Sequence, residues 1–170
     1  MNFDKKYLVF LLSLLVFMLC FGNAQAMNPN KRQSIVVKLN SFDAANWEDP
    51  VAGGHNWQSV CMAMGITDHV LGRKLGPRYA NEVTLFLNLS AVELADTVDV
   101  PDLSIFTCSS GKNLQQYWDD LISKGVSIMV CPGCAVIGGV TPDIVREGAH
   151  MGNMPSVQQL FLRADKVIDF

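Results

Sequence analysis

The stretch Gly125-Val126-Ser127-Ile128-Met129-Val130-Cys131-Pro132-Gly133-Cys134 carries the most specific signal in the chain. Its apolar residues at 126–130 predict a short buried strand, and a helix-compatible segment follows to Ile137. A cysteine between a strand and a helix lies beside free backbone N–H groups, which stabilise an anion. This stretch therefore predicts thiolate chemistry in an α/β fold.

Outward from this stretch, strand-like and helix-like segments alternate. Strands are predicted at 34–39, 82–87, 149–151 and 166–170, and longer helices at 57–75, 113–124 and 156–163. Short helical turns are expected at 91–95, and 96–111 is expected to be an ordered loop. A further helix is expected to begin at Thr141, with Thr141 as the N-cap and Pro142 as the first helical residue. The alternation predicts a single α/β domain with a mostly parallel sheet of about five strands and helices on both faces, in a flavodoxin-like three-layer arrangement.

In such sheets, ligands bind beyond the carboxyl ends of the strands, where Cys131 is expected to lie. If the first and third strands are neighbours, as in flavodoxin-like order, the Asn40-Ser41 turn and the loop bearing His55 would face this cysteine. His55 is the weakest member of the group, because a loop histidine is more often simply solvated.

The N-terminal segment predicts export. Lys5 and Lys6 precede an apolar run at 7–21, and Ala24-Gln25-Ala26 is a small-residue cleavage site, which is the pattern of a secretory signal peptide. We expect residues 1–26 to be removed and 27–170 to form the working domain, secreted and most simply periplasmic. An uncleaved anchor is the alternative, although a run of this length is short for spanning a bilayer.

The composition of the mature part excludes one class of partner. Residues 27–170 carry eleven Lys and Arg against fifteen Asp and Glu, a net charge of −4. This mild acidity predicts no nucleic-acid partner, and no membrane association is expected once the signal is removed. The cysteines Cys61 and Cys108 lie in an apolar stretch and in a polar, loop-like setting, respectively. We expect a buried hydrophobe and an exposed thiol rather than a disulfide, although an even cysteine count leaves pairing open.

The same segments carry a family resemblance. The run from Gly125 to Cys131 and the later Gly139-Val140 closely resemble the region around the reactive cysteine of the DsrE/DsrF-like sulfur-relay family. The segments 34–40 (SIVVKLN), 82–88 (EVTLFLN) and 164–170 (ADKVIDF) resemble the family's first two strands and its last. The resemblance implies a sulfur carrier or sulfurtransferase without a cofactor, usually assembled as a homotrimer or hexamer. Its partners would be a sulfur donor or acceptor, either a protein or a small sulfur compound.

Within this resemblance, persulfide chemistry falls on Cys131, and Cys134 is an additional residue that would resolve the persulfide or cycle as a dithiol. Members of the family that serve tRNA thiolation work in the cytoplasm, so an exported protein is not expected to share that duty.

Two other interpretations stay open. The first is a thioredoxin-like dithiol oxidoreductase, in which Met154-Pro155 would mimic a cis-proline. The second is a non-catalytic module that binds a small molecule, a protein or a soft metal. In the metal case, the two CxxC thiolates would need further ligands from Cys108, His150 or Met151.

Overall fold

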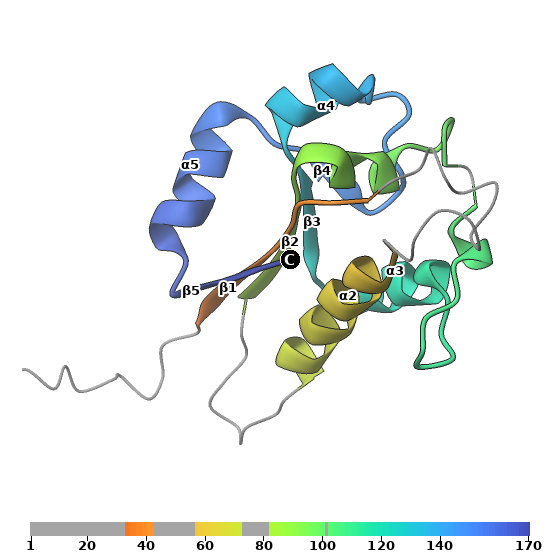
Figure 1. Cartoon of the computed structure of the whole chain (residues 1–170). Helices are drawn as coiled ribbons and strands as arrows, with labels where there is room; N and C mark the ends of the chain where they lie inside the picture. Colours follow the sequence, from red (N-terminus) through yellow and green to blue (C-terminus); the bar gives the residue numbers. More distant parts are fainter. Residues whose placement is uncertain (1–32, 43–56, 73–81, 101) are drawn as a thin grey trace, which may run out of the picture. The chain divides into compact units, whose positions relative to one another are not determined.

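A computed structural model of the chain describes residues 33–42, 57–72, 82–100 and 102–170 (Figure 1). The predicted signal peptide, its cleavage site and His55 lie outside the described residues. Among the helices that are described, none is long and apolar enough to cross a membrane.

The centre of the fold is a five-stranded sheet with the order β4-β3-β2-β1-β5, and every pair is parallel. The strands are β1 (Ser34–Leu39), β2 (Glu82–Leu87), β3 (Ser127–Val130), β4 (Ala149–Met151) and β5 (Lys166–Asp169). This confirms the predicted parallel α/β sheet. The flavodoxin-like adjacency of the first and third strands is wrong, because β2 lies between them.

One face of the sheet holds the main core. The helices α2 (Trp57–Gly72) and α3 (Leu114–Ser123) pack against each other on this side, and α2 also contacts β1 and β2. Alternate residues of the strands point into the core because the side-chain period of a strand is two. The buried strand residues on this face are Val37, Leu39, Val83, Leu85, Leu87, Ile128 and Val130.

The opposite face is covered more thinly, by α5 (Met154–Arg163) (Figure 1). Phe161 of α5 meets Phe86 of β2 edge to face, with ring centroids 5.2 Å apart. No residue of α5 is fully buried. The helix starts two residues earlier than predicted because Asn153 and Ser156 form a capping box, and Pro155 is accepted in the first turn.

The segment after Gly139 departs from prediction. Residues 142–144 form turns and Val145 forms an isolated β-bridge with Asp96, instead of the helix expected from Thr141. The cause is tertiary hydrogen bonding, since the N–H of Thr97 donates to the carbonyl oxygen of Ile144 at 3.1 Å, and the N–H of Arg146 donates to that of Ala95 at 2.7 Å. The 3₁₀ helix η2 (Leu89–Ala95), predicted as helical turns, is thereby tied to this segment. A second one, η3 (Leu103–Ile105), lies in the predicted loop.

Cys61 is buried as predicted, but the expectation that Cys61 and Cys108 are unpaired and that Cys108 is exposed is wrong. They form a disulfide, with their Cα atoms 5.7 Å apart, and both residues are buried. The polar sequence around Cys108 suggested an exposed loop, but this loop folds back onto α2. The bridge fastens the loop to the helix.

Candidate functional site at the strand ends

The three neighbouring strands β1, β2 and β3 end on the same side of the sheet, and an asparagine or a cysteine follows each of these three. Leu39 of β1 pairs with Leu87 of β2, so Asn40 and Asn88 come next in the same register. The ladder continues through these positions. The N–H of Asn88 donates to the carbonyl oxygen of Leu39 at 2.8 Å, and the N–H of Cys131 donates to that of Leu87 at 2.9 Å. Asn40, Asn88 and Cys131 are thus aligned across three strands.

Cys131 is the N-cap of α4 (Pro132–Gly138), as the strand-to-helix pattern predicted. Its Sγ accepts the backbone N–H of Cys134 at 3.4 Å, and its carbonyl oxygen accepts the N–H of Ala135 at 2.9 Å. Pro132 occupies the start of the helix, where a missing N–H costs nothing. The sulfur is half-buried and unpaired, so it is held in place while remaining accessible.

Cys134 lies one helical turn further on and has different partners. Its thiol donates to Oδ1 of Asn88 at 3.3 Å. Burial raises the pKa of the Cys134 thiol above its ordinary value, and the neighbouring Cys131 side chain raises it further, whereas the backbone of Leu89 lowers it. The structure therefore brings the two predicted site residues together but gives their sulfur atoms different roles in hydrogen bonding.

Asn88 and Asn40 continue this hydrogen bonding away from the cysteines. Nδ2 of Asn88 donates to Oδ1 of Asn40 at 2.9 Å. Nδ2 of Asn40 donates to the main-chain oxygen of Phe170 at 3.0 Å and to the carboxylate of Asp169. Asp169 in turn pairs with Lys38 at 2.9 Å. The predicted Asn40 turn does reach the site, although it does so through β2 rather than by direct contact between the first and third strands.

Asn88 is the residue that sequence reasoning missed. The signal was present, because the segments 34–40 and 82–88 both end in Leu-Asn directly after an apolar strand. Parallel strands place such ends at one edge of the sheet. Only the strand order shows that Asn88 stands between Asn40 and the cysteines.

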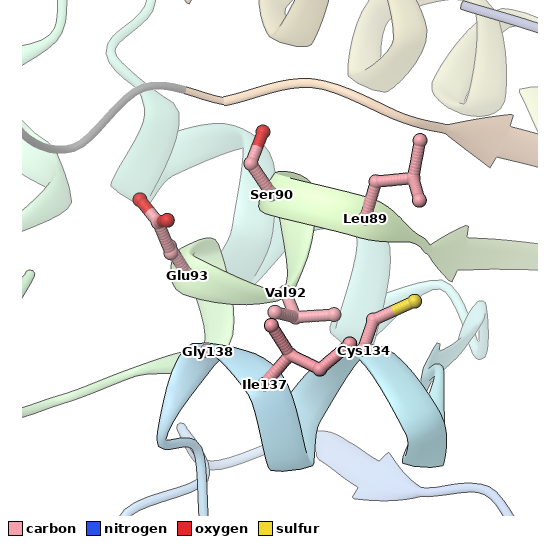
Figure 2. A pocket seen from close by; sticks show the side chains of 7 residues that line it. All are labelled: Leu89, Ser90, Val92, Glu93, Cys134, Ile137 and Gly138. Carbon is pink, nitrogen blue, oxygen red and sulfur yellow. The ribbon is translucent and has the colours of Figure 1, made fainter.

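An open pocket of about 350 Å³ adjoins Cys134 between η2 and α4 (Figure 2). Its walls are largely apolar, and Leu89, Val92 and Ile137 contribute to them. Glu93 is the carboxylate in the lining, and Ile137 is almost fully exposed. Pockets of this size and character hold small molecules or the side chains of partners. Cys134, rather than Cys131, forms part of the pocket wall.

The residues considered for a metal site do not converge. Cys108 is bonded to Cys61 in the disulfide, and His150 is exposed on β4. Within the described ranges, no group of three His, Cys, Asp or Glu side chains could hold a metal ion. The soft-metal interpretation therefore has no support from the geometry of this part of the chain.

Comparison with known proteins decides the family. The model of the DsrE/DsrF-like family matches residues 54–170. The chain belongs to the DsrE/DsrF-like family. The match includes Asn88, Cys131 and Cys134, whereas Asn40 precedes it.

A solved structure of the same fold supports this DsrE-like architecture. The crystal structure of the YchN protein from E. coli superposes with a TM-score of 0.53 at 19% sequence identity, covering 82% of this chain and 100% of YchN. No curated protein matches the chain in sequence. The DsrE-like sheet also removes the basis for the thioredoxin-like alternative. In addition, the Met154-Pro155 bond is trans and lies in the first turn of α5.

Proposed function

We propose that this DsrE-like protein carries sulfane sulfur on Cys131 as a persulfide and that Cys134 is the resolving thiol. Family membership supports sulfur relay in general. The observation that carries the specific assignment is the contrast between the two sulfurs. Cys131 Sγ accepts a backbone N–H, as an attacking thiolate would, whereas the Cys134 thiol donates to Asn88.

The proposed uptake step balances without an external oxidant. The Cys131 thiolate attacks the outer sulfur of a donor R–S–SH, the S–S bond of the donor breaks, and R–S⁻ leaves and takes a proton from solvent. An acceptor thiolate that attacks the outer sulfur of the resulting persulfide regenerates Cys131. Alternatively, the Cys134 thiolate attacks Sγ of Cys131, which forms a disulfide and releases HS⁻. A dithiol reductant must then reset the pair.

The pocket beside Cys134 is the proposed binding place for the R group of a sulfur donor or acceptor. Its apolar lining favours an R group that is small and apolar over one that is charged. Persulfides with aliphatic R groups should therefore load the protein faster than glutathione persulfide, which is negatively charged.

The decisive experiment uses the full chain reduced at the two site cysteines. Treatment with a sulfane-sulfur donor should add one sulfur atom, about 32 Da, at Cys131 by peptide mass spectrometry. The Cys131→Ser variant should gain nothing at this site, and the Cys134→Ser variant should accumulate the adduct. Absence of the adduct when Cys131 is shown to be free overturns the proposal. Repeated transfer to an acceptor thiol would separate a sulfurtransferase from a stoichiometric carrier.

Export of the protein is part of the proposal. The pattern at 1–26 supports it, and so does the buried Cys61–Cys108 disulfide, because such bridges persist in oxidising compartments such as the periplasm. Protein isolated from its own cells should begin at Met27 and carry this bridge. A cytoplasmic protein with an intact N-terminus would contradict this part of the proposal.

Assembly as a homotrimer or homohexamer is proposed as well. The thinly covered side of the sheet exposes large apolar side chains, among them Met154 and Leu162 of α5 and Val167 of β5. Exposed large apolar side chains are frequent at interaction surfaces. Light scattering should show a mass of three or six chains, and Leu162→Glu should lower it. A wild-type monomer would contradict this part of the proposal.

A further inference from the structure

Asn88, Asn40 and Asp169 form a hydrogen-bonded series that ends on the Cys134 thiol. They come from three neighbouring strands, because β2 lies beside β1 and β1 lies beside β5 (Figure 1). The links from Asn88 to Asn40 and from Asn40 to Asp169 are side-chain contacts across strand ends, and the link from Cys134 joins α4 to Asn88. The mechanism proposed above makes no use of this series, yet it reaches one of the two reacting sulfurs.

The acceptors at the Asp169 end determine which atom donates and which accepts in every hydrogen bond of the series. A carboxylate and a main-chain oxygen only accept hydrogen bonds, so Asn40 must turn its NH₂ group toward Asp169 and Phe170. Its Oδ1 then faces Asn88, which must present its own NH₂ group to Asn40. The amide orientations, usually ambiguous, follow here from the acceptor-only partners. Asn88 is left with Oδ1, an acceptor, for Cys134.

An amide oxygen can bind a thiol but not a thiolate. Ionisation of Cys134 would place a sulfur anion against Oδ1 of Asn88 and break the 3.3 Å contact. Rotating the Asn88 amide to offer its NH₂ group would instead set two acceptor oxygens, those of Asn88 and Asn40, against each other. The series therefore penalises the thiolate form of Cys134 specifically.

We propose that the Asp169–Asn40–Asn88 series is a polarity lock that keeps Cys134 a thiol while Cys131 takes up and holds sulfur. Asn88 is a positioning residue in this scheme, since it acts through Cys134 and touches no substrate. The biological role of the lock rests on the function proposed above. The lock delays attack of Cys134 on the Cys131 persulfide, so that an acceptor thiol can take the sulfur first.

The surroundings of Cys134 show why Asn88 matters after loading. Cys131 lies one turn away on the same helix, and Glu93 of η2 lines the same pocket as Cys134. The Lys38–Asp169 pair lies beyond Asn40. Burial raises the pKa of this thiol, and the Cys131 side chain raises it further, whereas the backbone of Leu89 lowers it. Loading with sulfur alters the Cys131 side chain itself, whereas Asn88 and its partners are chemically unchanged, so we expect the Asn88 contact to persist. The lock thus acts at the stage when premature disulfide closure would release the sulfur.

The test measures the ionisation of Cys134 directly. Full-length protein with Cys131→Ser, which removes the neighbouring thiol, is alkylated with iodoacetamide between pH 6 and 10.5, and the modification of Cys134 is quantified by mass spectrometry. In this background, Asp169→Asn gives Asn40 a partner that can also donate, and Asn88→Ser replaces the amide with a hydroxyl that either donates or accepts. Each should shift the profile to lower pH by about half a unit, or about threefold more thiolate at pH 7.

A matched control is Asp165→Asn. Asp165 accepts the N–H of Ser34 at the opposite end of β1, so the same acid-to-amide change is made far from the cysteines. Its profile should match that of the parent, and circular dichroism checks the fold of each variant. Unchanged profiles in both Asp169→Asn and Asn88→Ser overturn the lock. Alkylation needs no sulfur donor, so failure of Cys131 to load would overturn only the function proposed above.

With Cys131 restored, the same variants should shorten the lifetime of the persulfide. After loading and removal of the donor, release of HS⁻ at pH 7 should be about threefold faster in Asn88→Ser than in the wild type, in proportion to the thiolate present. The Asp165→Asn variant should release it at the wild-type rate. Equal release from all three proteins contradicts the delay assigned to the lock.

Discussion

Removing the Cys61–Cys108 disulfide is expected to destabilise the fold strongly. The bridge joins residues 47 positions apart and fastens the loop after η3 to α2. In the chain-entropy account, closing a loop of this length restricts the unfolded chain by about 4 kcal/mol. A domain is typically stable by about 5–15 kcal/mol, so the loss would be a large part of the total.

The perturbation is the double variant Cys61→Ala and Cys108→Ala. Alanine avoids burying a new hydroxyl, because both sulfur atoms lie in the hydrophobic core. Urea denaturation followed by circular dichroism should show a midpoint well below that of the oxidised wild type. The reduced wild type should fall close to the double variant, since it lacks the same bridge.

The matched control is Cys131→Ala with Cys134→Ala, which removes two unpaired cysteines from the same chain. Its midpoint should change far less, because no loop closure is lost. Equal midpoints for the oxidised wild type and the Cys61/Cys108 variant would refute the stabilising role of the bridge. Equal midpoints would also weaken the proposal that this protein works in an oxidising compartment.

Three further predictions follow from the structure. Arg146→Met should cost about 3 kcal/mol in urea unfolding, because the buried guanidinium donates to the carbonyl oxygens of Leu94, Asp96 and Val100, which would be left without these bonds; an unchanged midpoint would contradict that role. Ile137→Glu should slow uptake of sulfur from aliphatic persulfides several-fold by placing a charge at the apolar pocket, and equal loading rates would show that donors do not use the pocket. The pKa of the Cys134 thiol is higher in the folded protein than the ordinary value of 9.0, so the unfolded thiol ionises first as the pH rises. The stabilisation that this difference provides is complete below pH 9 and is lost as the pH rises through the pKa of the folded state. The free energy of unfolding should therefore fall less over this range in Cys134→Ala than in the wild type.

The strands and the position of Cys131 could be predicted from local sequence because the physics involved is local. Apolar, β-branched runs such as SIVVKL and EVTLFL favour strands wherever they are buried, and alternation with helices favours parallel pairing. The helix at Leu114–Ser123 followed from its apolar stripe and its closing glycine. Cys131 stood out because its position at a strand-to-helix junction is itself a local pattern.

Two features could not be predicted this way because they depend on partners distant in sequence. The segment from Thr141 carries a good helix start, yet hydrogen bonds from Thr97 and to Ala95 hold it in turns. Cys108 sits in polar sequence but is buried against α2 through its disulfide. Local propensity is worth a few tenths of a kcal/mol per residue, and tertiary contacts outweigh it.

The sequence alone determined the parallel α/β class, the place of Cys131 at the end of a strand and its nearness to Cys134, because spacing along the chain is sufficient for these. Only the tertiary structure decided the order of the strands. That order places Asn88 between Asn40 and Cys134 and links the thiol to Asp169, which lies more than thirty residues away in the chain. The physical reason is that directional hydrogen bonds across strand ends depend on which strands are neighbours.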